Sequence, residues 1–204
     1  NYFISGRHLA QYYKSKGGKG IVDFMNWGDE AAASLEHPHA QRGMIIEGME
    51  SFYKQGKLVE LFQKLNGDEK LSMEKIMEII RRDYRPLFVF ENEHIFIYVP
   101  YSQMHPDETE VIFKNAGNAL DFSDYDIEIA ARSMLGVIHG LRIHRGVTDI
   151  NLVLQQSDFN NGNNGFRMSV AIEPRNKNKH GGIEIGHSAY VIPGSPEITA
   201  EALR

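Results

Sequence analysis

The residues of this sequence that are best suited to chemistry are two histidines followed by an amide, in the run His37-Pro38-His39-Ala40-Gln41. Imidazole is neutral and nucleophilic near pH 7, so a histidine can attack phosphorus and carry the transferred group as a reactive phosphoramidate. This chemistry needs an acceptor that holds the second ring nitrogen, and it needs amides and backbone N–H groups around the phosphate oxygens. Gln41 faces the same side of a strand as His39, because side chains two residues apart share a face. The motif therefore indicates group transfer at phosphorus by His39.

The stretch from Phe24 to Gln41 resembles the galactose-1-phosphate uridylyltransferase family of the histidine-triad superfamily, which includes ADP-glucose phosphorylase relatives. The family pattern is Phe-x-Asn-x-Gly, a run of small residues, and Ser-x-x-His-Pro-His-x-Gln, and every spacing matches without a gap. The resemblance extends over most of the chain, although only this stretch is highly specific. It implies a nucleotidyltransferase that moves a nucleoside monophosphate between a nucleotide sugar and a sugar 1-phosphate through a covalent nucleotidyl-histidine intermediate.

Position by position, the resemblance implies that His39 is the covalent nucleophile and that Gln41 holds the transferred phosphate. Further candidates for contact with substrate phosphates are Asn26, Gly28, Ser34 and Arg175. For Arg175 the alternative is an ion pair with a carboxylate, and the sequence does not choose between the two roles. The expected partners are thus a nucleotide sugar and a sugar phosphate.

Two histidines resemble zinc ligands of the family, namely His37 and, at the end of a strand-like run, His8. The resemblance also implies that the helix usually found after His8 is shortened or missing. The chain contains no cysteine, so the family's cysteine pair is absent and any metal site within the chain uses His, Asp or Glu. Hydrogen bonding of His37 to a backbone group is an equally good interpretation. We expect at most a structural zinc and no organic cofactor.

The sequence departs from the family pattern at two places. The Tyr-Glu pair that reads the hexose is replaced by His187-Ser188, and the His-x-His pair of a second metal site is absent from 166–170. Three functions therefore stay open. The first is the transferase, the second is a phosphorylase or hydrolase of a nucleotide sugar or dinucleotide, and the third is a degenerate nucleotide-binding module without turnover.

The bulk properties restrict the partners of the chain. It has 204 residues, a net charge of −5 and a pI near 6.0, which argues against a protein that wraps nucleic acid. No apolar run approaches the length of a membrane span, so we expect a cytoplasmic location and no membrane partner. The resemblance implies a homodimer. The chain begins with Asn1 rather than Met, from which we expect a fragment of a longer protein.

The order of the predicted elements indicates an α+β protein, with histidine-triad-like antiparallel sheets, packed helices and two related halves. Residues 1–85 form the first half, which is partial and carries the motif, and residues 86–204 form the second. Helical periodicity is present between 47 and 82, where Ser72 caps a helix from Met73 to Arg82, and between 124 and 141. Strands are expected at 2–4, 21–25, 87–91, 94–100, 110–114, 151–155 and 166–173.

Overall fold

The structure is a computed structural model that describes residues 2–46, 72–159, 166–175, 192 and 194–204. Its helices are α1 (Tyr2–Ser15), α3 (Met73–Asp83), α4 (Asp124–Arg145) and α6 (Pro196–Leu203). Its strands are β1 (Gly20–Trp27), β2 (His39–Ile45), β3 (Phe88–Glu91), β4 (Ile95–Tyr98), β5 (Thr109–Phe113), β6 (Ile150–Gln155) and β7 (Ser169–Pro174). Short 3-10 helices lie at Asp29–Ala31, Arg85–Leu87 and Ala119–Asp121.

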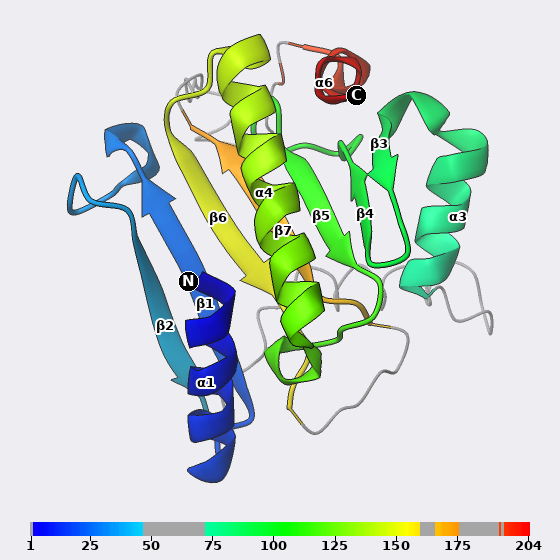
Figure 1. The fold of residues 1–204 in the computed structure, drawn as a ribbon. Coiled ribbons are helices and arrows are strands. Elements are labelled where there is room, and N and C mark those ends of the chain that lie inside the picture. The colour runs from blue at the N-terminus through cyan, green and yellow to red at the C-terminus, as the bar shows by residue number, and fades with distance from the viewer. Residues whose placement is uncertain (1, 47–71, 160–165, 176–191, 193) are drawn as a thin grey trace, which may run out of the picture.

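The seven strands form one antiparallel sheet in the order β2-β1-β6-β7-β5-β4-β3. Helix α4 crosses one face of this sheet, and α1 lies against the same face beside β1 (Figure 1). The predicted α+β class and the antiparallel pairing are confirmed.

Alternation along the strands gives the sheet two different faces. Leu152 and Leu154 of β6, with Val170 and Ile172 of β7, point to the face that α4 covers and are buried there. Burying such a side chain stabilises the fold by roughly 1.5–3 kcal/mol. The opposite face carries the intervening residues of β6 and β7. At the far end of the sheet, α3 packs against Phe96 and Ile112 in a second apolar cluster.

The predicted strand at residues 2–4 is wrong, because these residues begin helix α1. Phe3, Gly6 and Ala10 are buried on one side of this helix, whereas Ile4 and His8 are exposed. The burial repeats every three to four residues, which is the period of a helix and not of a strand. His8 therefore lies within α1, which ends at Ser15, rather than at a strand end. The implied shortening of the helix after His8 stays a prediction.

The strands on either side of Pro86 belong to the same sheet. β1 pairs with β2 on one side and with β6 on the other, so the sheet runs across the predicted boundary. The described strands of both predicted halves therefore form one sheet, because β6 pairs with the edge of the β1–β2 hairpin. The division of the chain into two related halves stays a prediction.

The remaining helix predictions are confirmed where the chain is described. Ser72 Oγ accepts a hydrogen bond from the Lys75 backbone at the start of α3, and Ser123 with Asp126 forms a capping box at the start of α4. Helix α4 continues beyond its predicted end and stops at Gly146, which has φ 67°. The helical pattern expected in 47–71 lies outside the described residues. No described helix is long and apolar enough to cross a membrane.

A buried ion pair joins β1 to β2, and hydrogen bonds of its two residues connect this hairpin to α1. Arg42 Nε of β2 donates to Asp23 Oδ2 of β1 at 2.8 Å, and the two side chains are only 9% and 2% exposed. The Tyr2 hydroxyl donates to the other oxygen of Asp23 at 2.6 Å, and Arg42 also donates to the Tyr2 carbonyl and to Ser5 Oγ. Burial raises the pKa of Asp23, against the opposing hydrogen bonds from Tyr2 and Arg42. These charges are thus compensated by specific partners on three elements.

Replacing Asp23 by alanine should destabilise the fold by about 3–5 kcal/mol, because it leaves the Arg42 guanidinium buried without its carboxylate. Urea unfolding followed by circular dichroism measures this difference. The matched control is Glu128→Ala, which breaks an exposed i,i+4 pair with Arg132 on α4 and should cost about 1 kcal/mol or less. Equal losses for the two variants would contradict a special role of the buried pair.

Candidate active site

The sheet register places the predicted nucleophile at one end of a row of polar side chains. His39, the first residue of β2, pairs with Asn26 of β1, which pairs with Asn151 of β6, which pairs with Glu173 of β7. Directly paired residues point to the same side of a sheet. Their neighbours along the strands, including Met25, pack against the α4 core, so the row lies on the opposite face. It crosses the end of the sheet where β1 and β7 finish and β6 begins (Figure 1).

The imidazole of His39 is held in one orientation by its own chain. His39 Nδ1 lies 3.1 Å from the carbonyl oxygen of His37. A carbonyl only accepts hydrogen bonds, so Nδ1 carries the proton and donates, and Nε2 keeps its lone pair. This is the arrangement that a histidine nucleophile requires. The backbone of His37, rather than its side chain, supplies the acceptor.

Gln41 follows His39 on β2, where its backbone pairs with Phe24. Because the two residues are two positions apart in a strand, their side chains share a face, with Cα atoms about 7 Å apart. The backbone thus brings a nucleophile and an amide together as the motif predicts. Their roles in catalysis stay predictions.

Gly28 shapes the loop between β1 and β2. Its φ of 94° is a conformation that residues with a Cβ rarely adopt, and a Cβ there would lie 2.4 Å from Asp149 Oδ2. The same Asp149 oxygen accepts a hydrogen bond of 2.8 Å from the Glu30 backbone N–H. The Gly28 carbonyl in turn accepts hydrogen bonds from the backbone N–H groups of Ala31 and Ala33. Gly28 therefore allows the loop to close over Asp149.

Two asparagines connect this loop to the sheet. Asn151 Nδ2 donates to Asn26 Oδ1 and to the Ala31 carbonyl, each at 2.9 Å. Asn26 Nδ2 points to the Ala32 carbonyl at 3.4 Å. The amide of Asn26 is therefore held in a fixed orientation next to His39. Ser34 lies farther along in an exposed bend before β2.

Sequence reasoning missed Asn151 and Asp149 as parts of this site. Asn151 was predicted only as the beginning of a strand, and its contact with Asn26 joins residues 125 positions apart. The available signal is its polar side chain between the apolar residues Ile150 and Leu152, and this signal does not identify the partner.

Arg175 lies directly after β7, and its backbone N–H donates to the Asp149 carbonyl at 2.8 Å. Its guanidinium Nη1 contacts His105 Nε2 at 2.9 Å. The structure thus places Arg175 beside a histidine from the loop before β5. Neither of the two roles considered for Arg175 is decided by this contact.

His37 and His8 are both exposed, His37 in the bend before β2 and His8 on α1. Among the residues that the structure describes, no group of three or more His, Cys, Asp or Glu side chains could hold a metal ion. The described residues therefore do not fit a zinc site at either histidine. The assignment of the two as zinc ligands stays a prediction.

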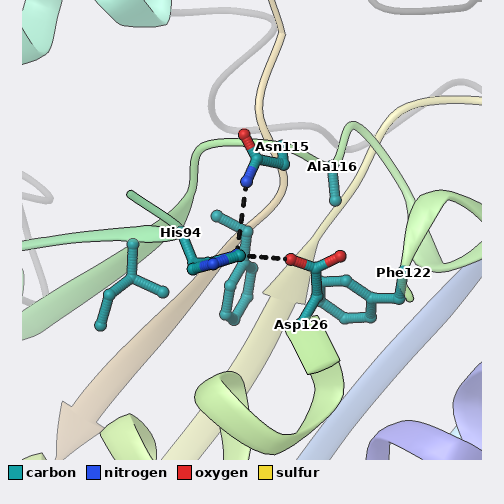
Figure 2. Close-up of a pocket in the computed structure, with 7 residues that line it drawn as sticks. His94, Asn115, Ala116, Phe122 and Asp126 are labelled. Atoms are coloured by element: carbon teal, nitrogen blue, oxygen red, sulfur yellow. Dashed lines mark hydrogen bonds and ion pairs between the residues drawn. The ribbon is translucent and has the colours of Figure 1, made fainter. Parts of the chain in front are cut away.

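A second polar cluster lies away from the motif, where the β3–β4 turn meets the start of α4. Figure 2 shows His94 between Asp126 and Asn115 in a pocket that Ala116 and Phe122 also line. His94 Nδ1 is 2.9 Å from Asp126 Oδ1, and Nε2 is 3.2 Å from the Glu93 carboxylate. The hydrogen bond with Asp126 raises the pKa of His94 above its usual 6.5. This pair joins the N-terminus of α4 to the sheet.

Comparison with known proteins shows the fold. The chain superimposes on a uridylyltransferase structure with a TM-score of 0.79 and 20% identity, over 98% of this chain and 65% of that one. It matches a galt-like protein from Arabidopsis thaliana with a TM-score of 0.75 and 17% identity, over 100% of this chain and 66% of that one. An ADP-glucose phosphorylase from Arabidopsis thaliana with bound ADP-glucose gives the same TM-score and identity, over 100% and 63% of the two chains.

The chain thus has the fold of these proteins and spans slightly less than two thirds of their length. No protein-family model matches the sequence, and no curated protein does.

Gly28→Ala should destabilise the protein by about 1–3 kcal/mol, because alanine is strained at this positive φ and its Cβ would clash with the side chain of Asp149. Thermal unfolding measures the loss. Gly43→Ala on β2 is the matched control, because a Cβ at that position meets no atom within 4 Å. A Gly28→Ala protein as stable as the control would contradict the close approach of Asp149.

The His94–Asp126 pair predicts a pH dependence of stability. The pKa of His94 is raised in the fold. The contribution of the pair to the free energy of unfolding is therefore fully present below the pKa of His94 in the unfolded chain, and it is lost as pH rises through the pKa in the fold. Wild type should therefore lose part of its unfolding free energy between about pH 5.5 and about pH 9, and His94→Gln should lose less. Urea unfolding at both pH values tests this. His139→Gln, at an exposed position on α4, should behave as wild type.

Proposed function

We propose that this protein is a nucleotidyltransferase in which His39 carries a nucleoside monophosphate from a nucleotide sugar to a sugar 1-phosphate. The observation that carries the proposal is the contact of 3.1 Å between His39 Nδ1 and the His37 carbonyl, which leaves Nε2 as the nucleophile. Gln41 and Asn26 lie on the same sheet face. The similarity in fold to a uridylyltransferase and an ADP-glucose phosphorylase supports the proposal.

In the first step, His39 Nε2 attacks the phosphorus that bears the nucleoside. The N–P bond forms while the bond from phosphorus to the bridging oxygen breaks, and the sugar 1-phosphate leaves with that electron pair. The ring keeps its proton at Nδ1, so positive charge develops beside the His37 carbonyl, whose dipole stabilises it. The amide of Gln41 donates to an oxygen of the phosphorus centre, where negative charge is greatest.

In the second step, a phosphate oxygen of the incoming sugar 1-phosphate attacks the same phosphorus. The new P–O bond forms, the N–P bond breaks, and the electron pair returns to His39 Nε2. The proton at Nδ1 stays in place throughout, so the His37 carbonyl serves both steps. Neither step requires a metal at His37 or His8.

The second candidate function is phosphorolysis, in which inorganic phosphate receives the nucleotide. The similarity in fold to an ADP-glucose phosphorylase favours it, and the chemistry at His39 is the same up to the covalent intermediate. A hydrolase differs only in that water is the acceptor. The contact at His39 Nδ1, which leaves the lone pair at Nε2, supports the two enzyme functions over the nucleotide-binding module without turnover. The homodimer, the zinc and the cytoplasmic location stay predictions.

The proposal is tested by intact-mass spectrometry after incubation with UDP-glucose or ADP-glucose. Wild type should gain the mass of one nucleoside monophosphate, and the added mass identifies the base. His39→Ala and His39→Asn should lose both the adduct and turnover, because neither side chain offers a nitrogen nucleophile. His39→Gly should partly recover turnover with added imidazole.

Two variants of the same motif act as controls. His37→Ala keeps the backbone carbonyl that holds His39, so the adduct should still form and any loss should be one of melting temperature. Gln41→Ala should slow adduct formation roughly a hundredfold or more, as expected for a lost transition-state hydrogen bond. An active His39→Ala protein would end the covalent mechanism for this chain.

A further inference from the structure

Three charged or titratable side chains meet at the other end of the polar row. Glu173, on β7, occupies the row position three strands away from His39. Its carboxylate Oε2 is 3.8 Å from His105 Nε2, and the same nitrogen is 2.9 Å from Arg175 Nη1. The side chains of His105 and Glu173 are 7% and 17% exposed. These residues form a half-buried cluster that no step at His39 uses.

The protonation of this cluster follows from Arg175. A guanidinium only donates hydrogen bonds, so His105 Nε2 is the acceptor and the proton of its neutral ring is on Nδ1. The Glu173 carboxylate only accepts. The cluster therefore offers an acceptor beside the remaining donors of Arg175, in a site where partial burial strengthens charged hydrogen bonds.

The distance between the cluster and His39 defines which part of a substrate reaches it. Adjacent strands lie about 4.8 Å apart, so Glu173 is roughly 14 Å from His39 across the sheet. The amides of Asn26 and Asn151 occupy the row between them. One phosphate and one sugar ring, extended from the phosphorus bound at His39, bridge such a span.

A sugar ring suits this cluster better than a nucleobase. Each sugar hydroxyl both donates and accepts a hydrogen bond, so neighbouring hydroxyls are matched by a carboxylate next to a guanidinium. A base instead needs flat apolar surfaces for stacking, as well as neutral polar groups along its edge. The cluster carries charges of both signs and thus favours the hydroxyls.

We propose that Glu173, His105 and Arg175 form the sugar subsite, where Glu173 accepts from a ring hydroxyl and Arg175, oriented by His105, donates to its neighbour. The inference rests on the proposed function, because the position of His39 defines where the sugar lies. The sugar that leaves and the sugar that enters occupy this subsite in turn.

Calorimetric titration of the protein with glucose 1-phosphate, and separately with inorganic phosphate, tests the subsite without any turnover. Glu173→Gln and Arg175→Lys should each weaken glucose 1-phosphate binding roughly tenfold or more, the effect of one lost charged hydrogen bond. Glu173→Gln should leave inorganic phosphate binding within about twofold of wild type, because phosphate alone does not reach Glu173. The exposed control Glu128→Gln on α4 should change neither titration.

The same variants are then compared in the discharge of the His39 adduct by the two acceptors. Glu173→Gln should raise the glucose 1-phosphate concentration for half-maximal discharge roughly tenfold or more and leave discharge by inorganic phosphate unchanged. Equal losses with both acceptors, or no loss with either, would overturn the subsite. A wild-type protein that binds glucose 1-phosphate through Glu173 but forms no adduct would overturn the proposed function and leave the subsite standing.

Discussion

The register of β1 against its two neighbours is the constraint on which the site depends. Met25 and Trp27 pack towards the α4 core, and this leaves Asn26 on the opposite face. Because the side-chain period of a strand is two, a slip of one residue would turn His39 or Asn151 to the helix face. The apolar residues of the core thus determine where the polar row lies, although none of them belongs to it.

The buried ion pair of the first hairpin reinforces this register from the helix side. Arg42 and Asp23 are directly paired residues of β2 and β1, three positions along their strands from His39 and Asn26. A charge pair of this kind stabilises only the register in which both partners meet, since either charge alone is costly in the core. The pair therefore aligns His39 with Asn26, and Tyr2 and Ser5 extend that alignment to α1.

The elements with strong local signals could be predicted from the sequence. Ser72 before an apolar periodic run marked α3, and short runs of consecutive apolar residues marked β4, β5 and β6. The strand prediction at residues 2–4 is wrong for a local reason, because a run of aromatic and β-branched residues has a high strand propensity. The pattern of buried residues, which repeats with the period of a helix, is visible only in the fold. Within the candidate site, the motif gave His39 and Gln41 because their relation is local. Asn151 and Glu173 join the site through pairing of distant strands, which no local pattern specifies.

Asp149 connects the loop beside His39 to the proposed sugar subsite at Arg175. Its side chain holds the loop at Glu30, next to Asn26 and His39, while its carbonyl oxygen holds the backbone of Arg175. Thr148 donates to the remaining carboxylate oxygen and so restricts the rotation of that side chain. Asp149 therefore links the loop that carries Gly28 directly to the backbone of Arg175. The distance between His39 and the cluster of Glu173, His105 and Arg175 is thus determined by backbone groups and short side chains. Such groups have few rotatable bonds, so they maintain a more fixed geometry than long side chains alone would.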